Sequence, residues 1–206
     1  MSYLLAGALL LASYLIGSVP PAFLVAKWVA GIDIRRHGSG NVGATNVLRT
    51  LGPGPSAAVF ALDFLKGCIP AWVGWQLSGS LLVGSLCGVA AVCGHNWSVF
   101  LRFTGGKGVT TSLGAILVLL PLVGGIALLV GSAVIGVTRY VSLGSMVGAA
   151  VVVLGALVVV ILGGPPEQLV YCLIVGPMTI YRHRDNIKRL LRGTESKLGQ
   201  RVRIER

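Results

Sequence analysis

The amino-acid sequence predicts an all-α polytopic membrane protein with seven transmembrane helices, an N-terminus outside the cell and a cytoplasmic C-terminus. Three observations lead to this fold class. Of the 206 residues, 54% are hydrophobic and only 11% are charged, whereas a soluble domain carries roughly 25% charged residues. The hydrophobic residues form seven runs, and nearly all Lys and Arg residues fall in alternate connections between these runs. We therefore expect one domain, covering residues 1–206, that crosses a membrane repeatedly.

The first apolar run is long enough to cross a membrane and shows no cleavage site of a signal peptide. The second run carries Asp63 and Lys66, and because charge inside a membrane is costly, we expect these two side chains to form an interior ion pair. The fourth and fifth runs hold 31 residues, broken at Pro121, which is long for one crossing and short for two. In chain order the runs are 3–28, 56–77, 80–100, 109–121, 122–139, 143–162 and 166–182.

The distribution of basic residues decides between six and seven crossings. With seven crossings and an outside N-terminus, sixteen of the seventeen Lys and Arg residues lie on the cytoplasmic side, and Lys66 lies inside the second run. With six crossings, Arg139 and the basic C-terminal tail would lie on the opposite side from the first two basic loops. Because cytoplasmic connections are enriched in Lys and Arg, seven crossings are favoured.

The net charge of +11 and the pattern of Cys and His residues argue against several other classes of protein. In a chain this apolar, positive charge is best explained by cytoplasmic loops beside anionic lipid, so no nucleic-acid partner is expected. The four cysteines lie in predicted spans without a C-x-x-C pair, which is typical of small buried residues. His37, His95 and His183 are far apart in the sequence, so no metal site is predicted.

The segment GSGNVGATNVLR, residues 38–49, is polar and glycine-rich although its surroundings are apolar. Glycines allow a ligand to approach the backbone closely, and Arg49 can bind a phosphate through two parallel hydrogen bonds. A plain solvated loop, the alternative, would rarely need so many Gly and Asn residues. We therefore predict a phosphate site, with further hydrogen-bonding groups from Ser39, Asn41, Thr45 and Asn46.

A second glycine-rich segment, FTGGKGVTT at residues 103–111, surrounds Lys107. It opens a predicted helix, whose first amides and dipole favour an anion. It is not a Walker A loop, because Leu101 and Gly108 stand where that motif requires Gly and Ser or Thr, so no nucleotide is predicted. The alternative is a lysine that merely extends from the membrane boundary toward water. The glycines of this segment are Gly105, Gly106 and Gly108.

The segment YRHRDNIKRLLRGTESK, residues 181–197, follows the last apolar run and belongs to a basic amphipathic cytoplasmic tail predicted for residues 183–206. Its Arg and Lys residues are typical of a helix that binds anionic headgroups. His183 and Asn186 stand three positions apart on one helix face, and a functional role is favoured for this pair. His95 fits a structural and a functional role equally well, and Ser142, one residue of a polar turn, indicates little by itself.

Several catalytic patterns are missing from the sequence. It has no G-x-S-x-G nucleophile motif, no H-x-x-x-x-D arrangement of the common glycerolipid acyltransferases, and no Asp cluster that would hold Mg²⁺. An enzyme built from these polar blocks would bind and orient phosphates without an obvious nucleophile or metal, and no cofactor is expected.

The blocks GSGNVGATNVLR, GHNWSVFLRFTGGKGV and YRHRDNIKRLLRGTESK, with YVSLGS between the last two, resemble the bacterial PlsY family of acyl-phosphate:glycerol-3-phosphate acyltransferases. The resemblance covers the chain except for residues 198–206. It implies that the sn-1 hydroxyl of glycerol 3-phosphate attacks the carbonyl of a fatty acyl phosphate, giving lysophosphatidic acid and phosphate at the first step of phospholipid synthesis. It also implies a bacterial plasma (inner) membrane protein with its active site facing the cytoplasm, and no obligate protein partner is inferred.

The resemblance assigns roles to individual residues, with Ser39 and Arg49 as essential and Lys107 in the glycerol 3-phosphate site. Because an acyl phosphate is already activated, positioning and charge stabilisation suffice and no covalent acyl-enzyme is expected. The base is either His183, favoured by its intrinsic pKa, or the phosphate oxygen of the donor, which we favour. Which phosphate each glycine-rich block holds stays open. The other implied site residues are Asn41, Thr45, Asn46, Gly105, Gly106, Gly108, Ser142 and Asn186, with Glu195 in a structural role.

Two other classes of protein remain as alternatives. A carrier or channel for organic phosphates should have polar groups at mid-membrane and a repeated architecture, whereas the polar blocks here fall on one predicted face and no repeat is evident. A non-catalytic membrane scaffold would leave the polar blocks unexplained.

Overall fold

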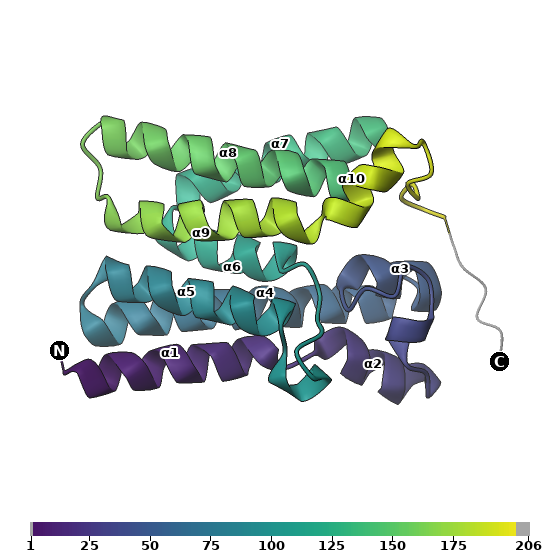
Figure 1. Cartoon of the computed structure of the whole chain (residues 1–206), viewed down its shortest axis with the longest axis horizontal. Helices are drawn as coiled ribbons and strands as arrows, with labels where there is room; N and C mark the ends of the chain where they lie inside the picture. The colour runs from purple at the N-terminus through teal and green to yellow at the C-terminus, as the bar shows by residue number, and fades with distance from the viewer. Residues whose placement is uncertain (1, 201–206) are drawn as a thin grey trace.

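The computed structural model describes residues 2–200 and is all-helical over that range, apart from a single isolated β-bridge between Ser98 and Thr104 (Figure 1). Two short 3₁₀ turns, η1 (Ile34–Arg36) and η2 (Val99–Leu101), accompany the α-helices. The α-helices of the described residues are α1 (Tyr3–Ser18), α2 (Pro21–Ala30), α3 (Ala44–Leu51), α4 (Pro53–Ser78), α5 (Leu81–Asn96), α6 (Val109–Leu119), α7 (Pro121–Thr138), α8 (Val141–Ile161), α9 (Glu167–Arg182) and α10 (Arg184–Leu191).

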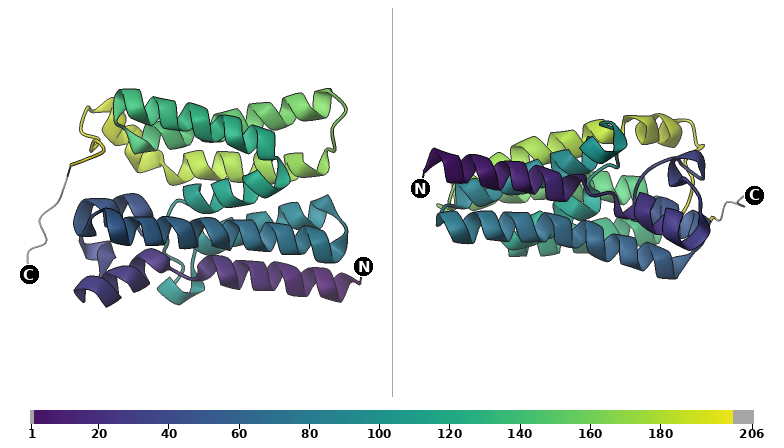
Figure 2. Two further views of the ribbon diagram at one scale, coloured as in Figure 1. Left: turned by 180° about the vertical axis from the view of Figure 1, so that it is seen from behind. Right: turned by 90° about the horizontal axis from the view of Figure 1, so that it is seen from below.

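The long helices lie side by side in one bundle. Helix α4 packs on α5 and α6, α1 packs on α5, α7 packs on α8, and α9 contacts α5 and α8. The short helices α2, α3 and α10 gather at one end of this bundle, and both views of Figure 2 agree on that placement. We call this the polar end, because the loop from residue 97 to 108 also lies there (Figures 1 and 2) and because the segments gathered there carry basic residues such as Arg35, Lys107 and Lys188.

The first apolar run is not one continuous helix, which differs from the run predicted for residues 3–28. Helix α1 ends at Ser18 and α2 begins at Pro21. Pro20 and Pro21 have no backbone N–H, and a proline ring clashes with the carbonyl group four residues earlier, so the helix cannot continue through them. Pro21 instead occupies the first turn of α2, where the missing N–H does no harm. The polar end therefore gains a separate helix.

The fourth and fifth runs form separate helices, divided at Pro121 as the sequence suggests. Helix α6 has 11 residues, which span about 16 Å, much less than the roughly 30 Å of a hydrocarbon core. Such a short helix is tolerated because protein surrounds it. Glycines bring the backbones of α4 and α6 together: a Cβ on Gly67 would lie 1.9 Å from the Thr111 carbonyl oxygen, and one on Gly114 would lie 2.1 Å from the Phe64 carbonyl oxygen.

Length and hydropathy alone single out four candidate membrane spans among the described residues, namely 3–30, 53–78, 121–138 and 141–161. The helices described above confirm the predicted all-α fold. The seven crossings and the orientation of the termini stay predictions. The predicted ion pair in the second run is confirmed, because Lys66 Nζ lies 2.7 Å from Asp63 Oδ1 and both side chains are buried. Of the predicted basic tail, residues 184–191 form α10, and residues 201–206 lie outside the described part.

Candidate active site

The loop before α3 is held from inside by Asn46, which is only 1% exposed. Its Nδ2 donates to the carbonyl oxygens of His37 and Asn41 at 3.0 Å each and of Ile34 at 3.2 Å, and its Oδ1 accepts from the Ser39 amide at 2.9 Å. Gly38 has a φ of 60°, and a Cβ there would lie 2.2 Å from Asn46 Oδ1. The predicted pocket residue Asn46 therefore shapes the loop through the backbone.

This arrangement leaves the other predicted side chains of the first block accessible. Ser39 is exposed, and Asn41, Thr45 and Arg49 are partly buried. Arg49 projects from α3 and its Nη2 donates to the carbonyl oxygen of Ser196 at 3.1 Å. Its Nε is buried and, within residues 2–200, has no hydrogen-bond partner. Burial lowers the pKa of Arg49 below its usual value, although the nearby Glu195 opposes this shift. Such a partly desolvated guanidinium is well suited to bind an anion.

The second block forms a glycine loop, Gly105–Gly108, that is clamped by backbone contacts on two sides. The Gly106 amide donates to the His95 carbonyl oxygen at 3.1 Å. From the other side, Arg182 Nη2 donates to the carbonyl oxygens of Gly105 at 3.0 Å and Gly106 at 2.7 Å. Gly108 has a φ of 74° and precedes α6 without a side-chain cap, so amides of the first turn of α6 remain free for an anion.

Lys107 is carried by this loop and donates a hydrogen bond to Asn186 Oδ1. The lysine is therefore turned into the protein, which argues against the alternative of a side chain that only reaches for water. Burial lowers the pKa of Lys107 to about 8, and although Glu195 opposes the shift, the cations Arg189, Arg49 and Arg182 add to it. This ammonium group is poorly solvated and surrounded mostly by positive charge, so it would gain strongly from a bound phosphate.

Glu195 links the third block to the first turn of α8, where the structure places Ser142. Its Oε1 accepts from Ser142 Oγ at 2.9 Å and from Asn186 Nδ2 at 2.7 Å, and its Oε2 accepts from Arg189 Nε at 2.8 Å. Burial would raise the pKa of Glu195, but these three hydrogen bonds together lower it. Because Asn186 donates to Glu195, its oxygen is directed toward Lys107. These contacts fit the structural role predicted for Glu195 and explain why Ser142 lies near the site.

His183 lies between α9 and α10 and is 2% exposed. Its Nδ1 is 2.8 Å from the Thr179 carbonyl oxygen, and because a carbonyl only accepts, Nδ1 must carry the proton. In the neutral ring the lone pair is then on Nε2. Burial first, and then the charge of Lys107, lower the pKa of His183 to about 4. His183 is thus neutral at neutral pH but is a weaker base than an ordinary histidine.

Residues of the three distant blocks therefore meet at the polar end: Lys107 contacts Asn186, Glu195 accepts from Asn186 and Ser142, and Arg49 reaches Ser196. The side chains of Ser39, Asn41 and Thr45 belong to the first block but make no hydrogen bond to this group within the described residues.

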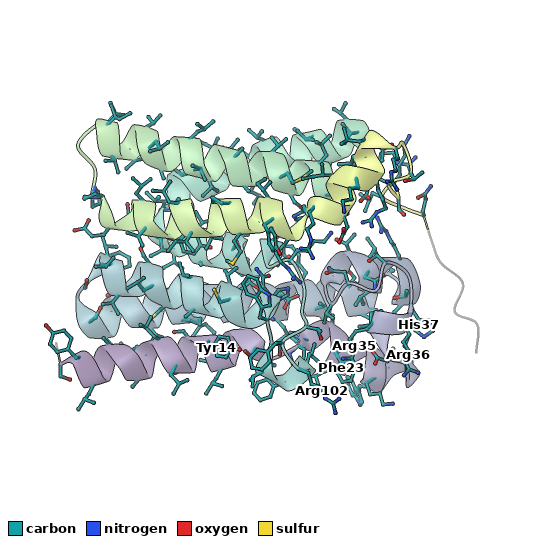
Figure 3. The ribbon with its side chains drawn as sticks, in the orientation of Figure 1. Tyr14, Phe23, Arg35, Arg36, His37 and Arg102 are labelled. Carbon is teal, nitrogen blue, oxygen red and sulfur yellow. The ribbon has the colours of Figure 1, made fainter. Side chains whose placement is uncertain are left out.

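The segment 194–200 contacts several of these residues and connects α3 with the turn between α7 and α8. In addition to the Arg49 contact, the Leu198 amide donates to the Arg139 carbonyl oxygen at 2.7 Å, and Arg139 Nη2 donates to the Leu198 carbonyl oxygen at 2.8 Å. Figure 3 shows Arg35, Arg36, His37 and Arg102 at the same end, on the side of α2.

Two residues at the site were not identified as such from the sequence. Arg182 was assigned with the other basic residues to headgroup binding, yet its guanidinium holds the glycine loop and lies 5.6 Å from the centre of the Trp97 ring. His95, left open, lies directly beneath the same loop. No spacing in the sequence distinguishes Arg182 from its neighbour Arg184, which is exposed.

An apolar cavity of about 140 Å³ lies between α6, α7, α8 and α9. Its wall includes Ile116, Gly131, Gly148 and Val175, and Thr179 lines it as well. The carbonyl oxygen of Thr179 is the group that holds His183, so the cavity ends beside the polar site. A site for charged groups and a space for an apolar group thus adjoin each other.

Known proteins resemble this chain over nearly its whole length. The family model for glycerol-3-phosphate acyltransferase matches residues 7–193. A glycerol-3-phosphate acyltransferase of Thermoanaerobacter sp. (strain X514) is 49% identical over 193 residues, covering 94% of this chain and 96% of the relative. Glycerol-3-phosphate acyltransferase 1 of Deinococcus radiodurans is 46% identical over 193 residues, with the same coverage of 94% and 96%.

Two solved structures share the fold. The crystal structure of PlsY, an integral membrane glycerol 3-phosphate acyltransferase, in its glycerol 3-phosphate form superposes with a TM-score of 0.87 at 42% identity, covering 94% of this chain and 96% of that chain. The lysophosphatidic acid form gives a TM-score of 0.85 at 41% identity, covering 95% and 96%. The family match, the identities and the shared fold show that this integral membrane protein belongs to the PlsY family of glycerol-3-phosphate acyltransferases.

Proposed function

We propose that this protein transfers a fatty acyl group from an acyl phosphate to the sn-1 hydroxyl of glycerol 3-phosphate. The observation that carries the proposal is the pair of partly desolvated cations Lys107 and Arg49, together with an apolar cavity whose wall begins at Val109, two residues after Lys107. Both substrates of this reaction carry a phosphate, and one also carries a long apolar chain. The two cations and the cavity match these requirements. The solved relative, in its glycerol 3-phosphate and lysophosphatidic acid forms, supports the acceptor and the product.

We assign glycerol 3-phosphate to the second block and the acyl phosphate to the first. Lys107 and the free amides at the start of α6 would hold the phosphate of the acceptor, with Asn186 and Ser142 completing this side of the site. Arg49 and Ser39 would hold the phosphate of the donor, within the loop shaped by Asn46. The acyl chain would enter the cavity between α6 and α9.

In the reaction, the sn-1 oxygen forms a bond to the acyl carbonyl carbon, and the bond from that carbon to the phosphate oxygen breaks. The phosphate leaves with the electron pair, and the hydroxyl proton passes to a phosphate oxygen of the donor. No covalent acyl-enzyme is needed, because the donor is already activated. The protein contributes by positioning both substrates and by stabilising the charge that develops on the leaving phosphate.

The lowered pKa of His183 supports the donor phosphate, rather than the imidazole, as the base. With a pKa of about 4, His183 would accept a proton from an alcohol less readily than an ordinary histidine. Its neutral Nε2 remains able to accept a hydrogen bond from the substrate hydroxyl. We therefore assign His183, with Asn186, to orientation of the acceptor.

We further propose that the protein is a single domain that crosses the bacterial plasma membrane seven times, with its N-terminus outside and the polar end in the cytoplasm. The basic residues at the polar end, including Arg35, Arg139 and Lys188, support this orientation through the positive-inside rule. The site would then receive a water-soluble acceptor from the cytoplasm and an apolar donor from the bilayer. No cofactor and no obligate protein partner are required by this scheme.

Purified protein in detergent, given palmitoyl phosphate, tests the proposal. We expect release of phosphate and formation of 1-acyl lysophosphatidic acid only when glycerol 3-phosphate is present, with or without Mg²⁺. NMR shows which hydroxyl of glycerol 3-phosphate carries the acyl group. A Lys107→Ala variant, which lacks the ammonium group of the proposed site, is the control. Activity with palmitoyl-CoA and none with palmitoyl phosphate would overturn the donor assignment. Counterflow of labelled glycerol 3-phosphate in liposomes without any acyl donor would instead support a carrier.

A further inference from the structure

Three ionisable side chains form a buried cluster inside the bundle, separate from the residues assigned to the substrates. Lys66 Nζ lies 2.7 Å and His95 Nδ1 lies 3.3 Å from the same oxygen, Oδ1 of Asp63. The exposed fractions are 2% for Asp63, 6% for Lys66 and 8% for His95. Asp63 and Lys66 come from α4 and His95 from α5, so the cluster joins two helices. Ionisable groups at such positions in membrane proteins commonly serve function.

One side of the cluster is anchored to the backbone where α1 ends. Lys66 Nζ donates to the Val19 carbonyl oxygen at 2.8 Å. Val19 follows the last residue of α1 and precedes Pro20 and Pro21, so the local helix does not supply the usual amide partner for its carbonyl group. Lys66 is thereby fixed at two points, and Asp63 is fixed by Lys66. The position of the Asp63 carboxylate is therefore well defined.

The other side of the cluster contacts the glycine loop. The His95 carbonyl oxygen accepts from the Gly106 amide at 3.1 Å, and a Cβ on Gly105 would lie 2.2 Å from that same oxygen. The imidazole is equally close, because a Cβ on Gly106 would lie 2.0 Å from His95 Nε2. A rotation that moves the His95 ring toward the loop would displace Gly106, and a rotation away from the loop would remove its support. The contact of His95 Nδ1 with Asp63 Oδ1, at 3.3 Å, opposes such a rotation.

We propose that the Asp63–Lys66–His95 cluster is a positioning element that sets the geometry of the glycine loop and thereby aims Lys107 at the phosphate of the acceptor. Gly105 and Gly106 lie between His95 on one side and Arg182 on the other, and Lys107 is the next residue. The cluster would act on glycerol 3-phosphate through the loop, without touching it. This inference rests on the proposed function for the identity of the ligand.

A buried ion pair is seldom required for stability, since replacing both partners with apolar residues is often neutral or even stabilising, whereas removing one partner leaves an unpaired buried charge. The test therefore uses the double variant Asp63→Asn/Lys66→Met, which removes both charges together. A second variant, His95→Gln, keeps the ion pair and removes the ring from beneath Gly106. Ser85→Ala is the matched control, because Ser85 is a fully buried polar residue of α5 with no role in this scheme.

Equilibrium binding of labelled glycerol 3-phosphate is measured without any acyl donor, beside the KM values for both substrates and the Tm. In both variants we expect the Kd and the KM for glycerol 3-phosphate to rise by about tenfold or more, because a small displacement of a binding group has effects of this size. The KM for palmitoyl phosphate and the Tm should stay as in the wild type. Ser85→Ala should change none of these quantities.

Unchanged binding in a folded variant, or an equal loss for both substrates, would overturn the proposal. If the double variant does not fold, His95→Gln alone decides by the same criteria. The binding measurement also separates this proposal from the proposed function. If the variants lose glycerol 3-phosphate binding, the positioning element is supported, even if the wild type does not use palmitoyl phosphate. If the wild type is active and the variants bind glycerol 3-phosphate as the wild type does, the proposed function stands and the positioning element is refuted.

Discussion

Lys107 and Asn186 are 79 residues apart in the sequence and form a direct hydrogen bond, from the ammonium group to the carboxamide oxygen. This contact joins the loop before α6 to the first turns of α10. Its direction is fixed by Glu195, which accepts from the carboxamide nitrogen at 2.7 Å and so leaves the oxygen to face the lysine. A neutral partner holds the ammonium in place without neutralising its charge, so that the charge stays available for the phosphate that we propose as its ligand.

Asn186→Asp should raise the KM for glycerol 3-phosphate by about tenfold to a hundredfold, because the new carboxylate would pair with Lys107 and compete with the phosphate. The new charge would also face Glu195, which accepts from Asn186 at 2.7 Å in the wild type. Steady-state kinetics with both substrates varied checks this. Asp185→Asn, which alters charge at an exposed position of the same helix, should leave the KM unchanged. An Asn186→Asp enzyme with a normal KM would show that the neutral partner is unnecessary.

The value of kcat/KM for glycerol 3-phosphate should fall as pH rises through about 8. Lys107 has a lowered pKa of about 8, so its ammonium is present below that pH and lost above it. One titrating group with this pKa predicts about a tenfold loss between pH 7 and pH 9.

Lys107→Arg provides the control for this pH dependence, because arginine keeps its charge throughout the range. The variant should have a lower kcat/KM at pH 7 and a much flatter profile up to pH 9, after subtraction of spontaneous acyl phosphate hydrolysis. The same alkaline decline in the variant would assign the titration to a group other than Lys107.

Replacing His183 by Gln should preserve a large part of kcat. If the donor phosphate takes the proton, the imidazole only orients the acceptor, and the variant should retain more than about a tenth of the wild-type kcat, whereas removal of a general base typically lowers the rate by 10²-fold to 10⁴-fold. Single-turnover rates at saturating substrates check this prediction. A loss of 10³-fold in a variant with an unchanged Tm would make His183 the base.

Some of the site could be predicted from the sequence because its physical causes are local. The Asp63–Lys66 pair follows from the cost of charge within an apolar helix and from a spacing of three positions. The polar character of residues 38–49 likewise stands out against an apolar background. His95 as a third member of the cluster could not be predicted, because its contact with Asp63 depends on how α4 and α5 pack. Asn46 was expected to help shape the pocket, but that its carboxamide turns inward to the loop backbone depends on the fold of that loop.

Replacing Arg182 by Lys should raise the KM for glycerol 3-phosphate by about tenfold. The guanidinium reaches two carbonyl oxygens of the glycine loop from Nε and Nη2, a geometry that an ammonium group cannot reproduce. The loop would then be held by His95 alone, and Lys107 would be less well placed. Arg184→Lys, at the exposed neighbour on the far side of His183, should retain wild-type kinetics. A normal KM in Arg182→Lys would show that positive charge at this position suffices and that the guanidinium is not a specific clamp.

Filling the apolar cavity should shorten the acyl chains that the enzyme accepts. Ala149 lines the cavity of about 140 Å³, and in Ala149→Phe the ring would take up much of that space. Ala150, the next residue of α8, is exposed, so Ala150→Phe would face lipid and controls for an added ring on the same helix. We expect Ala149→Phe to lower kcat/KM for palmitoyl phosphate by at least about tenfold relative to octanoyl phosphate, since each methylene that loses its apolar contact costs about 0.8 kcal/mol.

Competition between the two donors, read by mass spectrometry of the lysophosphatidic acids, measures the ratio directly. An unchanged ratio with Ala149→Phe would place the acyl chain elsewhere, because a ring in this cavity must displace any chain that occupies it.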